Sequence, residues 1–165
     1  MAKGIQAEIK QNKPFPSLEE EAFIALLRTA DQLQWRAAEM LKPHGLSPTQ
    51  YSALRILRGA GAEGLGCSEM AERMIHRDPD ITRLLDRLQR RRLIMRGRGQ
   101  KDRRVIKTRI TPAGLDLLKR MDGEVEEFHR GLLGHLGQQR LQLLIGHLEA
   151  AREKSEVEGA LEQTR

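Results

Sequence analysis

Residues 81–110 read ITRLLDRLQRRRLIMRGRGQKDRRVIKTRI, and this stretch decides the predicted fold. Its first part spaces apolar side chains at the interval of one buried helix face, at Ile81, Leu84, Leu85 and Leu88. Residues 93–96 and 105–110 are short apolar or alternating runs typical of strands, and the segment between them is rich in glycine, as in a hairpin turn. We therefore predict a helix that is followed directly by a β-hairpin.

The other edge of this helix is cationic, because Arg83, Arg87 and Arg90 fall at positions i, i+4 and i+7. Asp78-Pro79 predicts the helix start, with Asp78 as N-cap, so that Asp80 and Thr82 lie near its exposed N-terminal end. A solvated amphipathic helix would explain this segment alone. A short helix expected at about 68–74, a turn, this helix and the hairpin together predict a winged helix-turn-helix, whose second helix enters the major groove.

The charge of the chain is concentrated in the same region. The net charge is +6 for the whole chain and +9 for residues 77–109, which leaves −3 for all other residues. A solvated face is the simpler interpretation, but such local self-repulsion favours a polyanionic partner. A narrow cationic loop suits the minor groove, and the loop residues that we assign to DNA binding are Arg98, Lys101, Asp102, Arg103 and Arg104.

The flanking segments complete a mainly α-helical prediction. Capping boxes at Ser17–Glu20 and Ser47–Gln50 start two helices, and Thr111-Pro112 starts another. The predicted parts are an extended arm at 1–16, a first helix at 17–45, the DNA-binding lobe at 46–110, C-terminal helices at 111–152 and a frayed polar tail at 153–165.

Enzyme, cofactor and metal functions are not expected. The five histidines lack metal-ligand spacing, no phosphate-binding lysine follows the glycines at 59–66, and no Ser/His/Asp set suggests a nucleophile. No run of 18 apolar residues and no signal core is found, so we expect a cytoplasmic protein without membrane contact. We expect the lone cysteine, Cys67, to be a small buried residue rather than a redox switch.

Residues 46–114 resemble the MarR family of bacterial transcription regulators. The pieces that carry the resemblance, in the family's order and spacing, are LSPTQY at 46–51, SEMAER at 68–73, ITRLLDRL at 81–88, DRR at 102–104 and ITPAG at 110–114. The resemblance implies a homodimer on pseudo-palindromic double-stranded DNA, usually a repressor released by a small ligand or an oxidant. It also implies that Asp102 fixes the wing while Arg104 meets the minor groove, and that Arg83 and Arg87 contact DNA.

The resemblance further implies that the terminal helices pack between subunits, although they could instead complete a monomer core. A ligand cleft would lie beside the dimer helices, with Trp35, Met40, Tyr51 and Leu54 as candidates that core packing explains equally well. The chain departs from the family in its acids at 78 and 80 and in having Arg91-Arg92-Leu93 where a glycine is common. A winged-helix module that binds RNA or another protein is the alternative function.

Overall fold

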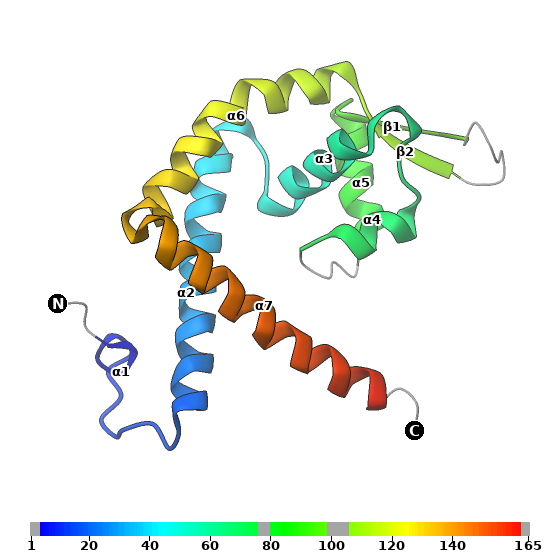
Figure 1. Ribbon diagram of the computed structural model, residues 1–165. Helices are drawn as coiled ribbons and strands as arrows, with labels where there is room; N and C mark the ends of the chain where they lie inside the picture. The colour runs from blue at the N-terminus through cyan, green and yellow to red at the C-terminus, as the bar shows by residue number, and fades with distance from the viewer. Residues whose placement is uncertain (1–3, 76–79, 99–105, 163–165) are drawn as a thin grey trace. The chain divides into compact units, whose positions relative to one another are not determined.

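The computed structural model describes residues 4–75, 80–98 and 106–162 and divides into two compact units, residues 1–118 and 119–165 (Figure 1). The first unit holds α1 (Ile5–Glu8), α2 (Leu18–Leu41), η1 (Lys42–His44), α3 (Pro48–Ala60), η2 (Gly61–Glu63), α4 (Cys67–Arg73), α5 (Ile81–Arg90), β1 (Ile94–Arg98), β2 (Ile106–Ile110) and the start of α6 (Pro112–Leu133). The second holds the rest of α6, η3 (Gly134–Leu136) and α7 (Gly137–Glu162). Across the described ranges, no helix has both the length and the apolar character needed to cross a membrane.

The predicted winged helix-turn-helix is confirmed in the first unit. Helix α3 contacts α4 and α5, and α5 contacts β1. Leu84, Leu85 and Leu88 of α5 are buried as predicted, whereas Ile81 is only half-buried. The other buried apolar residues of this lobe are Leu46, Ala53, Leu54, Leu57, Leu65, Met70, Met74, Leu93 and Ile94.

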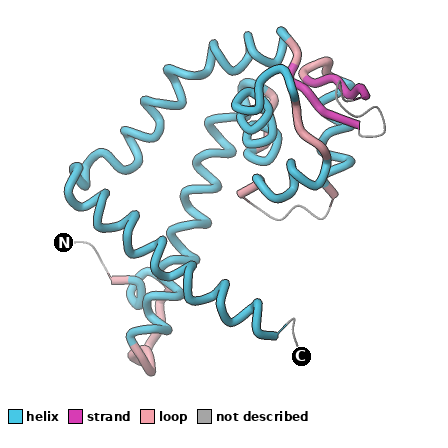
Figure 2. The backbone as a smooth tube through the Cα atoms, turned by 45° about the vertical axis from the view of Figure 1, so that its right-hand side comes forward, coloured by secondary structure: helices cyan, strands magenta, loops and turns pink. Residues whose placement is uncertain are grey.

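The wing is an antiparallel hairpin that runs from the pair Ile94↔Ile110 to the pair Arg98↔Ile106 (Figure 2). A third segment joins it, because Leu65 exchanges two backbone hydrogen bonds with Thr108, at 3.0 and 2.8 Å. Thr108 is buried. The segment between α3 and α4 is thereby bonded to the wing.

Helix ends follow the predicted capping signals to different degrees. At Ser47 the box is complete, because the Gln50 N–H donates to the serine hydroxyl and the Ser47 N–H donates to the Gln50 side chain. At Ser17 the hydroxyl accepts from the Glu20 N–H at 3.2 Å, which is one half of the predicted box. Both helices begin one residue after their serine, as expected for an N-cap.

Three predicted boundaries are wrong. Helix α5 starts at Ile81, and its N-cap is Asp80 rather than the predicted Asp78. The Asp80 carboxylate accepts a hydrogen bond from the Arg83 N–H at 3.1 Å. Asp78 lies outside the described residues. The extended arm contains the one-turn helix α1, which closes with the Schellman bond from Gln11 N–H to Gln6 O. Helix α7 continues to Glu162, beyond the expected tail start at residue 153, through a segment that contains four glutamates.

One expectation about burial is also wrong. Cys67, expected to be buried, is exposed as the first residue of α4, while Met70 of the same helix enters the core. The helical spacing of α2 places Phe23, Leu26 and Leu27 on one face, and these side chains are 59%, 45% and 53% exposed in the single chain. Helix α2 therefore carries an apolar face that one chain does not bury.

The entry to the wing has a left-handed residue at the position where the sequence lacks a glycine. Arg92 has φ 60°, and it ends α5 as a Schellman motif, with Leu93 N–H donating to Leu88 O and Arg92 N–H to Gln89 O. A side chain with a Cβ is disfavoured in this conformation by about 1–2 kcal/mol, which glycine avoids.

We expect Arg92→Gly to stabilise the fold by about 0.5–1 kcal/mol, because the left-handed strain is relieved and part of the gain is lost to the greater freedom of the unfolded chain. Urea denaturation measures the change. Arg92→Ala is the matched control: it removes the same charge but keeps the Cβ. An equal gain in both variants would show that charge removal, not backbone conformation, is responsible.

Gly64 lies against the wing at a distance that excludes a side chain. A Cβ at Gly64 would approach Thr108 O to 2.4 Å, and its φ is +66°. We expect Gly64→Ala to lower the free energy of unfolding by about 2 kcal/mol or more. Gly59→Ala is the control, because Gly59 is exposed on α3 with nothing within 4 Å, and there alanine should stabilise by up to about 1 kcal/mol. Thermal denaturation measures the stability of both variants. A loss of stability in Gly59→Ala as large as that in Gly64→Ala would contradict the steric explanation.

Candidate nucleic-acid interface

The exposed edge of α5 carries the predicted cations. Thr82, Arg83, Arg87 and Arg90 are all exposed, on the side of the helix opposite its buried leucines. Within the described part of the chain, Arg87 and Arg90 have no ion-pair partner. The outer edge of α5 therefore presents two uncompensated positive charges on a rigid helix.

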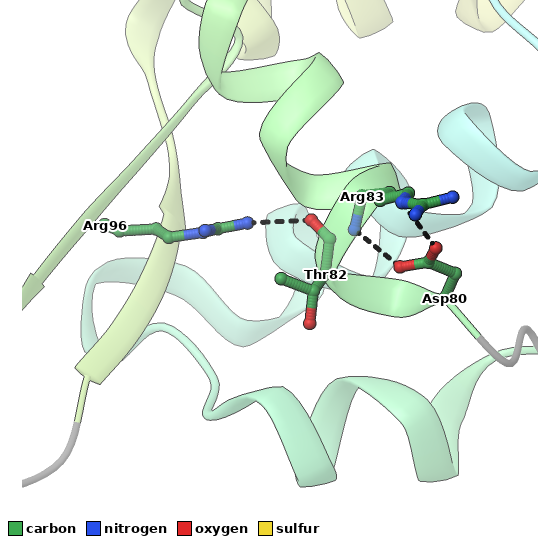
Figure 3. Close-up of polar contacts among 4 residues, drawn as sticks. All are labelled: Asp80, Thr82, Arg83 and Arg96. Carbon is green, nitrogen blue, oxygen red and sulfur yellow. Dashed lines mark hydrogen bonds and ion pairs between the residues drawn. The ribbon is translucent and has the colours of Figure 1, made fainter.

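Asp80 and Arg83 form a pair at the first turn of α5 (Figure 3). The carboxylate uses one oxygen, Oδ1, to accept from the Arg83 backbone N–H and the other, Oδ2, to contact the Arg83 Nε at 2.9 Å. The Asp80 side chain is 43% exposed and the Arg83 side chain is 78% exposed. The acid that the sequence places beside the expected DNA surface therefore caps the helix and also holds an arginine of that helix.

Arg96 joins the wing to α5 on the other side of the helix. Its Nη1 lies 2.7 Å from Asp86 Oδ1 and its Nη2 donates to Thr82 O at 3.2 Å, as Figure 3 shows for the second contact. The Arg96 side chain is only 24% exposed. One guanidinium from β1 thereby bonds two turns of α5 and sets the helix against the hairpin.

Other cations of the charged region also hold the lobe together. Lys107 of β2 contacts Glu69 of α4 at 2.6 Å, and the same carboxylate oxygen accepts from Gly66 N–H at 2.7 Å. The lysine and this N–H lower the pKa of Glu69 from its ordinary value. Arg109 donates to Ala62 O at 2.7 Å, and Arg91 donates to Gly45 O. The local excess of charge therefore includes cations with structural roles.

The wing supplies one described residue of the predicted site. Arg98 ends β1 and is exposed. Lys101, Asp102, Arg103 and Arg104 lie outside the described residues, so their assignment to DNA binding stays a prediction from the sequence. The hairpin strands that lead to this loop are described as far as the pair Arg98↔Ile106.

The four candidates for a ligand pocket differ in exposure. Trp35 of α2 is 64% exposed, Met40 and Tyr51 are half-buried, and Leu54 of α3 has no exposed surface. Leu54 is thus a core residue, and Tyr51 lies under the Arg55 guanidinium, 5.9 Å from the ring centroid. A pocket at these residues stays a prediction.

Sequence reasoning missed Arg96, Asp86, Lys107 and Glu69. These residues pair across 10 and 38 positions, which no helical or strand period reports. The available signal was strand alternation, which places Arg96 on the same face of β1 as the buried Ile94. An arginine on the inner face of a strand needs a buried or half-buried partner.

The chain matches a family model described as "MarR family" over residues 46–106. A crystal structure of a MarR transcription factor from Planctomyces limnophilus is 40% identical to it, with a TM-score of 0.63, and the match covers 83% of this chain and 99% of that one. The chain belongs to the MarR family. The resemblance that the sequence motifs indicated is therefore confirmed.

Two further similarities are more distant. The HTH-type transcriptional repressor MdtR of Bacillus subtilis is 34% identical over 91 residues, which are 55% of this MarR-family chain. The matched residues span 57% of the length of MdtR, and 65% of that of the B. subtilis regulator MhqR. The S. aureus MepR–DNA complex shares the fold, with a TM-score of 0.70 at 21% identity over 79% of this chain and 96% of that one.

We expect a double-mutant cycle of Arg96→Ala and Asp86→Ala to give a coupling of about 1 kcal/mol in the free energy of unfolding, because this pair is partly buried and joins two elements. The control cycle uses Glu126 and Arg130, an exposed pair within α6, which should couple by less than about 0.5 kcal/mol. Equal couplings would mean that Arg96 does not fix α5 to the wing more firmly than a surface pair does.

Proposed function

We propose that this protein represses transcription as a cytoplasmic homodimer bound to a pseudo-palindromic DNA operator. Each subunit places the N-terminal part of α5 in the major groove and its hairpin against the adjacent minor groove. The observation that carries the proposal is the exposed arginine edge of α5, set beside the wing by Arg96. Backbone phosphates are the natural counterions of Arg87 and Arg90.

The proposed roles divide among the predicted residues. Thr82 and Arg83 face base edges from the first turn of α5, while Arg87 and Arg90 follow the phosphates. On the wing, Arg98, Lys101, Arg103 and Arg104 bind at the minor groove, and Asp102 orders the loop. The family resemblance, together with the cationic sequence, supports these wing roles.

The dimer is supported by apolar surface on α2. Phe23, Leu26 and Leu27 lie on one face of the helix and are 59%, 45% and 53% exposed in the single chain. A monomer that kept these side chains in water would carry an apolar patch of the kind that marks an interface. A second copy of the chain is the occupant that the proposal assigns to this surface.

The repressor role rests on the relative MdtR, which is named a repressor. Release by a small molecule rests on the family resemblance, and Trp35, Met40 and Tyr51 are the residues proposed to meet the molecule. The proposal includes no cofactor and no catalysis.

Selection of bound sequences from random duplex DNA tests the proposal. We expect a two-fold symmetric site with half-sites about one helical turn apart, roughly 34–36 Å, and a dimer by sedimentation at micromolar concentration. Monomers only, or selected sites without symmetry, would contradict the dimeric assignment. Competition by double-stranded RNA as effective as that by duplex DNA would support the alternative of an RNA-binding module.

We expect Arg87→Ala to weaken binding to all duplex sequences alike, because it removes a phosphate contact and not a base contact. The slope of log K against log salt concentration should fall by about 1 per subunit. Titrations at several salt concentrations measure both quantities. Arg120→Ala, which removes an exposed charge from α6, is the control and should change neither. A loss confined to one operator base would assign Arg87 to base reading.

A further inference from the structure

The pair Asp80–Arg83 differs in its electrostatics from the rest of the α5 edge. Arg87 and Arg90 are uncompensated within the described residues, but Arg83 faces a carboxylate 2.9 Å from its Nε. The pair as a whole is neutral, so it adds little to the attraction of α5 for a phosphate backbone. If Arg83 contributed only to affinity, the adjacent Asp80 carboxylate would be unfavourable, because it neutralises the arginine and repels phosphates.

The geometry of the contact indicates what the pair does instead. Asp80 uses Oδ1 to cap the helix, so its carboxylate is fixed to the backbone of the first turn. Its Oδ2 then holds the guanidinium through Nε. The contact uses the Nε of Arg83 and does not need the two terminal nitrogens of the guanidinium, Nη1 and Nη2. The Arg83 side chain as a whole is 78% exposed.

The first turn itself is held from a second direction. Arg96 of β1 donates to the backbone oxygen of Thr82 and pairs with the side-chain carboxylate of Asp86, so residues on both sides of Arg83 are bonded to the wing. A long arginine side chain otherwise loses much rotamer freedom when it binds in one geometry. An acid that restricts the side chain before binding reduces this loss, as preorganisation does in general.

We propose that Arg83 determines sequence specificity by reading a guanine in the major groove, and that Asp80 is the positioning residue that aims it. This inference rests on the proposed function. The two Nη groups match the O6 and N7 acceptors of guanine, which is the base that arginine reads in a bidentate manner. Arg87 and Arg90 then supply affinity without base choice, and the Asp80–Arg83 pair supplies base choice with little affinity.

The test uses the full chain and two conservative variants. Arg83→Lys keeps the charge but loses the fork, and Asp80→Asn keeps an N-cap residue but loses the ion pair. Arg87→Lys is the matched control, since a phosphate contact tolerates lysine. Binding is measured by selection from random duplexes and by titration on the selected operator with each base substituted, at several salt concentrations. Circular dichroism checks that each variant is folded.

The wild-type protein should prefer guanine at one position of each half-site by about 5- to 150-fold. Arg83→Lys should remove most of that preference and leave other positions unchanged. Asp80→Asn should weaken the same preference severalfold, strengthen binding to random duplex DNA and steepen the salt slope by about 1 per subunit. Arg87→Lys should leave all base preferences as they are.

Two results would overturn the inference while leaving the proposed function intact. The first is a selected operator whose base preferences are unchanged in Arg83→Lys. The second is an Asp80→Asn variant that binds all sequences more tightly without losing the guanine preference, which would make Asp80 a helix cap only. If the wild-type protein selects no duplex sequence, the proposed function fails, and the specificity role fails with it.

Discussion

Burial of Leu84, Leu85 and Leu88 is the interaction on which the arrangement of this lobe depends. These three side chains hold α5 against α3, α4 and β1, and each contributes about 1.5–3 kcal/mol when fully buried. Because the helix has a period of 3.6 residues, burying this face directs Arg83, Arg87 and Arg90 outward. The packing of the leucines in the core therefore also determines that the arginine edge faces solvent.

The positive charge of the central region serves two purposes that the structure separates. Lys107 and Arg96 pair with Glu69 and Asp86 between elements, and both are largely shielded from water. Arg87 and Arg90 stay exposed. Neutralised pairs of the first kind stabilise the lobe without attracting a polyanion, whereas the exposed cations raise the local potential. A count of charges along the chain overestimates how much of the cluster is available to DNA.

Several short contacts meet at the junction of α5, β1 and α6. Arg92 closes α5 in a left-handed conformation, and its carbonyl accepts from the Thr111 hydroxyl at 2.7 Å. The same hydroxyl accepts from Gly114 N–H at the start of α6, where a Cβ on Gly114 would approach Leu93 O to 2.4 Å. Helix α5, the wing and the first turn of α6 are thus joined through a few short contacts.

The sequence by itself determined the helices, the hairpin, the buried face of α5 and its cationic edge, because these follow from local periodicity, capping residues and turn residues. The sequence shows that Asp80 lies beside the expected DNA surface, but only the structure shows that it caps α5 and pairs with Arg83. The pairs of Arg96 with Asp86 and of Lys107 with Glu69 depended on packing between distant segments, for which the sequence has no period. Exposure on α2 was likewise decided by the tertiary structure, since helical spacing reports that a face is apolar but not what covers it.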